Sequence, residues 1–111
     1  MKSDLSALEK AMLHKARETS FPCPVTGFLL DSYVASGVCW GYVYDHVKMD
    51  PQTGRFSDGH EIHTSTIGAF FEFGEYIILV TRNSVYVCIG EPSEQRSLIV
   101  DLQLLPGPAF H

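Results

Sequence analysis

The hydrophobic residues near the start of the chain recur at the spacing of an α-helix. The apolar stripe consists of Leu5, Leu8, Ala11, Met12 and Ala16. This spacing predicts a helix over about residues 4–18, with Ser3 or Asp4 as its N-cap. Prolines at positions 22 and 24 end the helical pattern. Because only one face is apolar, we expect the helix to pack on the rest of the protein rather than on a partner.

After the prolines the hydrophobic pattern changes to a period of two, which is typical of β-strands. The expected strands are 28–35, 38–48, 60–67 with a continuation over 69–73, 76–81, 85–89 and 97–105. Turns are expected at 49–54 and 58–59. The pattern predicts an α+β, β-dominated fold, with an N-terminal helix packed on a small antiparallel SH3-like barrel. The alternative is a strongly curved antiparallel sheet of five or six strands.

We expect one domain over residues 1–111, because a chain of this length fits a single core. It would comprise an N-terminal helix (1–20), an antiparallel β body (27–105) and a short tail (106–111).

The longest predicted strand, residues 38–48, is apolar on both faces. One face carries Val38, Trp40, Tyr42, Tyr44 and His46, and the other carries Cys39, Gly41, Val43, Asp45 and Val47. Two burying surfaces are therefore expected: the core on one side, and the helix or a second subunit on the other. The predicted strand 97–105 has a similar character and is a candidate edge strand for pairing across a homodimer.

Charge and composition narrow the class of protein. Hydrophobic residues make up 45% of the chain and the net charge is −5, as in an ordinary globular protein. Residues 1–18 carry four basic and three acidic side chains, whereas the remainder carries four basic and ten acidic ones. This acidic body argues against a nucleic-acid partner. The charged N-terminus and the absence of a long apolar run predict a cytoplasmic protein with no membrane partner. Three unpaired cysteines agree with a reducing compartment.

Two stretches of the chain carry a family resemblance. Residues 55–67 read as an aromatic residue, Asp-Gly and a strand ending in Thr-Ser and an aliphatic residue, and residues 80–87 contain Thr-x-Asn-Ser-x-Tyr. In this order they resemble small uncharacterised bacterial proteins of phage, genomic islands and integron gene cassettes, over about residues 55–88. That family has no established activity, so the resemblance implies an accessory protein on a mobile element and transfers no catalytic residue.

An aromatic row is the leading candidate for a binding surface. Trp40, Tyr42 and Tyr44 share one strand face, with His46 and Arg82 as candidate polar neighbours. No catalytic residue and no cofactor is predicted. The sequence therefore favours a non-enzymatic protein-interaction or small-ligand-binding module.

The alternative is a small hydrolase. Glu61 and His63 share a strand face and, with His46, form a candidate metal set, whereas His60 points to the opposite face. A cysteine nucleophile would need a base within reach, and Cys39 with His46 or His63 is the candidate pair.

Overall fold

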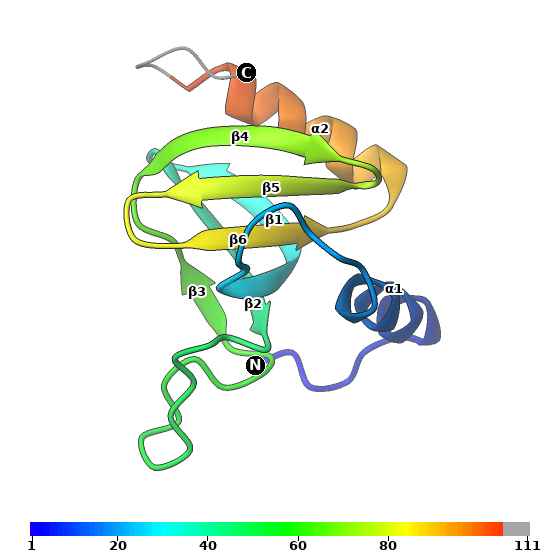
Figure 1. Ribbon diagram of the computed structural model, residues 1–111, viewed down its shortest axis with the longest axis vertical. Coiled ribbons are helices and arrows are strands. Elements are labelled where there is room, and N and C mark those ends of the chain that lie inside the picture. Colours follow the sequence, from blue (N-terminus) through cyan, green and yellow to red (C-terminus); the bar gives the residue numbers. More distant parts are fainter. Residues whose placement is uncertain (106–111) are drawn as a thin grey trace.

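The computed structural model describes residues 1–105, so the predicted tail at 106–111 lies outside the described residues. The elements in chain order are α1 (Ala7–Arg17), β1 (Gly27–Ala35), β2 (Val38–Tyr44), β3 (Glu61–His63), β4 (Ile67–Phe73), β5 (Tyr76–Thr81), β6 (Val85–Ile89) and α2 (Pro92–Gln103). The six strands form one sheet in the order β3-β2-β1-β6-β5-β4 (Figure 1). Within residues 1–105, no helix has the length and apolar character needed to cross a membrane.

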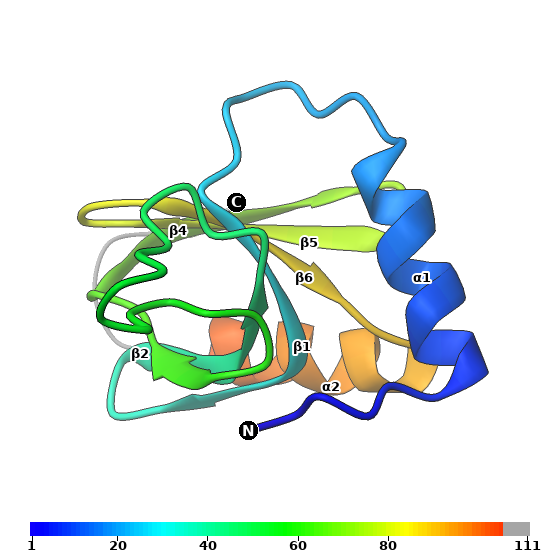
Figure 2. The same ribbon diagram turned by 90° about the horizontal axis from the view of Figure 1, so that it is seen from below.

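The two faces of the sheet are covered by the two helices, which lie on opposite sides of it (Figure 2). The core beneath α2 contains Leu29, Cys39, Val43, Ile67, Phe70, Ile77, Leu79, Tyr86, Cys88, Leu98 and Leu102. The core beneath α1 contains Leu13, Ala16, Leu30, Tyr44, Tyr76, Ile78, Val87 and Ile89. The chain itself therefore supplies both burying surfaces that the doubly apolar strand required.

The predicted α+β, β-dominated class is confirmed, in its curved-sheet form. The sheet has two edge strands, β3 and β4, so it is open and the SH3-like barrel was the wrong choice of the two. These edges are nevertheless joined by residues 64–66 alone. Such a short link can join the two edges only if the sheet curls strongly. The link is bonded at both ends: Thr64 N donates to Cys39 O on β2 (2.8 Å), and Arg82 N, just after β5, donates to Thr66 O (3.0 Å).

The expectation of a wholly antiparallel body was wrong at the centre of the sheet. β1 and β6 pair in parallel, with Leu29 opposite Cys88, and the other neighbouring strands pair antiparallel. β6 and the first half of β1, where the two strands pair, are buried on both faces and are almost continuously apolar. Such runs indicate burial but carry no information about strand direction.

The strand predicted over residues 97–105 was also wrong, because residues 97–103 belong to α2. Leu98 and Leu102 are the buried pair, one helical turn apart, whereas Val100 and Leu104 are exposed. The alternation of apolar residues thus concealed a helical spacing. Two signals of a helix start were present in the sequence: Pro92 at the first helical position, and a glutamate, Glu94, that accepts from the Glu91 backbone N–H.

The predicted N-terminal helix is confirmed with shifted limits. Ser6 and Glu9 form a capping box, so α1 starts three residues later than expected. Its buried residues are Leu13 and Ala16, while Leu8 is 51% exposed, because the helix faces the sheet about one position further round than the stripe suggested.

Two predicted strands end earlier than expected. β2 stops at Tyr44, because Asp45 adopts a left-handed backbone conformation (φ 56°). This turn removes His46 from the face of Trp40 and Tyr44. The predicted strand 60–67 breaks at 64–66, and its two parts become the opposite edges of the sheet.

The N-terminal segment is held against the Asp-Gly turn by Gly59. Lys2 N donates to Gly59 O (2.6 Å), and the Tyr44 hydroxyl donates to Lys2 O (2.6 Å). Gly59 has a φ of +87°, and a Cβ at this position would overlap the carbonyl oxygen of Lys2. Both the backbone conformation and the space therefore require glycine.

We expect Gly59→Ala to destabilise the protein more than Gly37→Ala. Gly37 also has a positive φ (+76°), but nothing lies within 4 Å of the position that an added Cβ would take there. Gly37→Ala should therefore cost only the conformational strain, about 1 kcal/mol, and Gly59→Ala should cost at least twice that. Urea unfolding of both variants checks this, and equal losses would contradict the close packing of Lys2 on Gly59.

Candidate functional site

A cavity of about 160 Å³ lies where β2 ends and β6 begins. Its lining consists of His46, Lys48, Arg55, Phe56, His63, Ser65, Asn83, Ser84 and Tyr86. These residues come from the segment 45–60, from β3 and the link that follows it, and from the β5–β6 turn and the start of β6. The floor is buried, since His46 is 5% and Tyr86 4% exposed, whereas the lysine and arginine lie on the exposed rim.

Hydrogen bonds fix the side chains of the floor. The backbone N–H of Lys48 donates to His46 Nδ1 (3.0 Å), so this nitrogen is unprotonated. The proton of the neutral ring therefore sits on Nε2, which lies 3.0 Å from the Tyr86 hydroxyl and donates to it. The imidazole is thus held in one tautomer and one orientation.

An aromatic stack closes one side of the cavity. The Phe56 ring lies on the His46 ring with centroids 3.9 Å apart and planes within 3°. The guanidinium of Arg55 lies over Phe56, 4.8 Å from its ring centroid. Phe56 has a φ of 58°, a conformation that is strained for a bulky residue and that is often found at functional sites.

The cavity has a positive electrostatic character. Burial lowers the pKa of His46, and the charges of Lys48 and Arg55 lower it further. Burial raises the pKa of Tyr86, so its hydroxyl stays protonated. No aspartate or glutamate belongs to the lining. Within residues 1–105, neither Lys48 nor Arg55 forms an ion pair.

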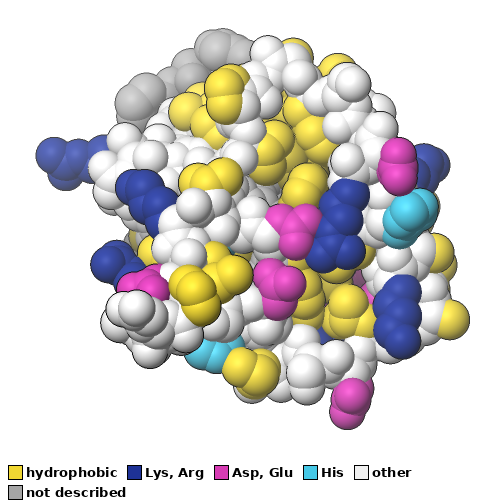
Figure 3. Space-filling model, turned by 60° about the horizontal axis from the view of Figure 1, so that its bottom comes forward, with side chains coloured by type: hydrophobic (Ala, Val, Ile, Leu, Met, Phe, Trp, Pro, Cys, Tyr) yellow, Lys and Arg dark blue, Asp and Glu magenta, His cyan; other side chains and the backbone are white. Residues whose placement is uncertain are grey.

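A larger hollow of about 300 Å³ lies between α1 and the N-terminal segment, and its lining contains Asp58 as well as three cations. Figure 3 shows hydrophobic side chains in a hollow bordered by charges of both signs. Its Lys2 pairs with Glu9 (2.6 Å) and Asp31 (2.5 Å), and its Arg17 pairs with Asp45 (2.6 Å). These two cations are already paired, so Lys10 is the one cation of this lining without an ion pair within residues 1–105.

The predicted aromatic row is divided between different surroundings. Tyr44 is buried beneath α1, and Tyr42 is half-buried with the Lys2 ammonium 5.8 Å from its ring centroid. Trp40 stacks on Tyr33 (6.4 Å between centroids, 8° between planes) and contacts His63 (4.8 Å). The Trp40 Nε1–H is buried without a hydrogen-bond partner in the described part of the chain.

The cavity lined by His46, Lys48 and Arg55 is called the basic cavity below. Of the five predicted ligand-binding residues, only His46 lines it. Trp40 adjoins it through His63, whereas Arg82 is exposed and lies outside the lining, although its neighbour Asn83 belongs to it.

The predicted metal set is not brought together. His46 and His63 line the same cavity, but Glu61 is not among its residues. In the part of the chain described, no group of three or more His, Cys, Asp or Glu side chains is arranged to hold a metal ion.

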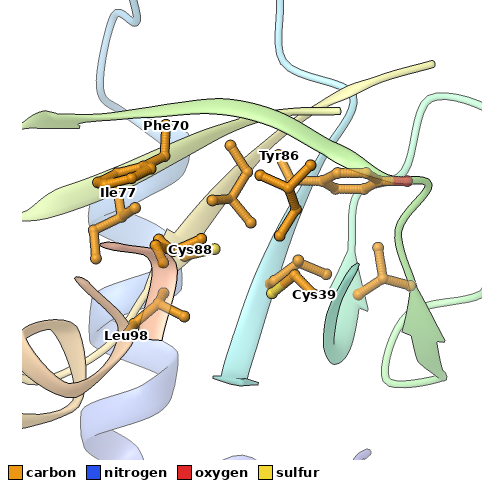
Figure 4. Close-up of a cluster of buried hydrophobic side chains, with 11 residues drawn as sticks. Cys39, Phe70, Ile77, Tyr86, Cys88 and Leu98 are labelled. Carbon is orange, nitrogen blue, oxygen red and sulfur yellow. The ribbon is translucent and has the colours of Figure 1, made fainter. Parts of the chain in front are cut away.

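The candidate cysteine nucleophile lies in the hydrophobic core. Cys39 and Cys88 are fully buried beneath α2, and Figure 4 shows their sulfurs turned toward each other. The hydrogen bond between the thiols and their burial raise the pKa of Cys88 well above its ordinary value. The Cys39 thiol donates to the Trp40 carbonyl (3.6 Å) and makes no hydrogen bond to histidine within residues 1–105. Both cysteines are packed as small hydrophobic residues.

Most of the cavity was missed by sequence reasoning. Lys48, Arg55 and Phe56 lie in the long segment between β2 and β3, where no periodicity links them to the β5–β6 turn. The signal in the sequence was the presence of turn residues, Asp50-Pro51 and Asp58-Gly59, on either side of Arg55 and Phe56. Such residues predict a folded loop, but they do not indicate which part of the protein the loop packs against.

Comparison with protein-family models, curated proteins and solved structures finds no match for the chain.

We expect the stability of the protein to fall in mild acid because of His46. Its pKa in the folded state lies below the ordinary 6.5, so the unfolded state takes up a proton first as the pH falls. The free energy of unfolding is therefore highest above about pH 6.5 and decreases as the pH falls from there through the lower pKa of the folded state. Urea titrations at pH 7.5 and 5.5 measure this loss.

His46→Gln should flatten that pH dependence, although at pH 7.5 it should cost about 1–2 kcal/mol through lost hydrogen bonding and stacking. The exposed His14 provides the matched control, and His14→Gln should retain the loss between pH 7.5 and 5.5. An unchanged slope in His46→Gln would show that other groups cause it.

The burial of two cysteines predicts one reactive thiol in the native protein. Cys23 is partly exposed, whereas Cys39 and Cys88 are buried. A thiol reagent should modify about one cysteine in buffer and all three in denaturant. Cys23→Ser should abolish the native reaction, and rapid modification of Cys39 in the folded protein would instead favour the Cys/His hydrolase.

Proposed function

We propose that the protein is a non-enzymatic small-ligand-binding module and that the basic cavity is its binding site. One observation carries the proposal: polar side chains from three separate stretches of the chain converge on a single concave site with a hydrogen-bonded floor. Pre-organised polar groups lower the entropic cost of binding a small molecule. A volume of about 160 Å³ holds roughly five water molecules, so the ligand group that enters is small.

The family resemblance supports the same region of the molecule. Seven of the nine lining residues fall within residues 55–88, the stretch similar to proteins of phage, genomic islands and integron gene cassettes. We propose an accessory role in such a mobile bacterial context.

The homodimer and the cytoplasmic location stay predictions. The expectation of a dimer rested on the apolar faces of residues 38–48 and 97–105. α1 and α2 of the same chain cover the sheet, so no surface is assigned to a second subunit.

Trp40 provides the measurement that tests ligand binding. It is the only tryptophan, and its indole contacts His63 at the rim of the cavity. We expect at least one member of a fragment panel with neutral, cationic and anionic compounds to shift the Trp40 emission. Amide chemical shifts should change at His63 and Ser84 with the same dissociation constant.

Ser84→Leu fills the cavity and should abolish the response, whereas Ser97→Leu, on the exposed face of α2, should retain it. The proposal is wrong if no compound binds, or if binding survives Ser84→Leu unchanged in a variant that still folds.

A further inference from the structure

We infer that the basic cavity binds a phosphate group, either inorganic phosphate or the phosphate of a monoester. This inference rests on the proposed binding function and names the chemical class of the ligand. Its grounds are uncompensated charge, the supply of hydrogen-bond donors and the size of the site.

The first ground is the isolation of two cations in an acidic protein. The net charge of the chain is −5, yet Lys48 and Arg55 line a cavity to which no carboxylate belongs. Of the six other cations, Lys2, Lys15 and Arg17 form ion pairs, as with Lys15 on Glu75 (2.6 Å), whereas Lys10, Arg82 and Arg96 form none within residues 1–105 and lie outside this cavity. Two like charges without counter-ions repel each other, and an anion between them would relieve this repulsion.

The second ground is the fixed geometry of Arg55. Its guanidinium lies with one flat face over the Phe56 ring, which itself lies on His46, and its N–H edge makes no hydrogen bond or ion pair within residues 1–105. A guanidinium edge binds two oxygens of a phosphate at once. The strained backbone of Phe56 (φ 58°) persists only where surrounding contacts such as this stack impose it.

The third ground is the number of hydrogen-bond donors near the two cations. The side chains of Asn83 and Ser84 belong to the lining and can each donate, and His63 stands on the rim. Below them, the His46 imidazole is neutral and the Tyr86 hydroxyl keeps its proton. The floor therefore places no negative charge against an anion. A tetrahedral oxyanion has enough acceptor oxygens to use several donors together.

A phosphate fits this site better than a carboxylate does. A phosphate monoester carries about −1.5 to −2 charges near pH 7, which matches two cations, whereas a carboxylate would leave one of them uncompensated. The room for roughly five water molecules suits a group of four or five non-hydrogen atoms.

Titration of the intact protein at pH 7.5 and constant ionic strength tests the inference. The probes are inorganic phosphate, glycerol phosphate, acetate and neutral glycerol, followed by Trp40 emission and by amide chemical shifts at the cavity. Inorganic phosphate and glycerol phosphate should both bind, and the one that binds more tightly shows whether the natural ligand is a free phosphate ion or a phosphate ester. Acetate should bind at least tenfold more weakly than either. Arg55→Gln and Lys48→Gln should each weaken phosphate binding about tenfold.

The matched controls are Arg96→Gln on α2 and Lys10→Gln on α1, both exposed and outside the cavity, which should bind phosphate normally. All four changes replace exposed side chains, so circular dichroism and thermal unfolding should confirm a native fold.

The different failures are distinguishable. Acetate binding as tightly as phosphate, or phosphate binding unaffected by Arg55→Gln and Lys48→Gln, overturns the phosphate inference. If neutral or cationic fragments occupy the cavity and phosphate does not, the inference fails while the proposed binding function stands. If nothing binds, both fail.

Discussion

The short link between the two edge strands is the constraint on which the rest of the molecule depends. β3 and β4 lie at opposite ends of the strand order, yet only residues 64–66 connect them. The sheet must therefore curl, and the link itself is fixed by Thr64, whose hydroxyl accepts from Cys39 N (3.0 Å) and donates to Ser65 O (2.8 Å). Because of this curl, β3 reaches the β5–β6 turn, where Ser65 donates to the Thr81 hydroxyl (3.0 Å) and accepts from Asn83 N (3.2 Å). The basic cavity lies at this junction.

Local patterns predicted the elements better than their arrangement. The helix at the N-terminus and most of the strands followed from periodicity, because side chains on a helix or strand face repeat regularly. The strand predicted over residues 97–105 and the wholly antiparallel sheet were wrong for the same reason. An apolar residue indicates that its position is buried, but it does not indicate which element packs against it. Leu98 and Leu102 fit a strand and a helix equally well by apolar character, and the central strands β1 and β6 are compatible with either direction of pairing.

The cavity was harder to predict than the fold for a related reason. His46 was placed on the aromatic face, since alternation assumes a strand that continues, and the left-handed turn at Asp45 reverses it. Its real neighbours, Phe56 and Tyr86, lie 10 and 40 positions away along the chain. The net charge also carries no information about this site, because an acidic total is compatible with a local pair of cations. What distinguishes Lys48 and Arg55 from Lys2 and Arg17 is the absence of carboxylate partners in the described chain, which only folding determines.

The parallel pairing of β1 with β6 has a consequence for how the chain reaches its native state. These two strands form the middle of the sheet but are separated by about fifty residues of sequence. During synthesis, β1, β2 and β3 emerge first, and one edge of β1 stays without hydrogen-bond partners until β6 has been made. Closing so large a loop is entropically costly and slows folding. The amino-terminal half is therefore a poor independent unit, and the nascent protein carries an exposed strand edge that is open to aggregation until its final third is complete.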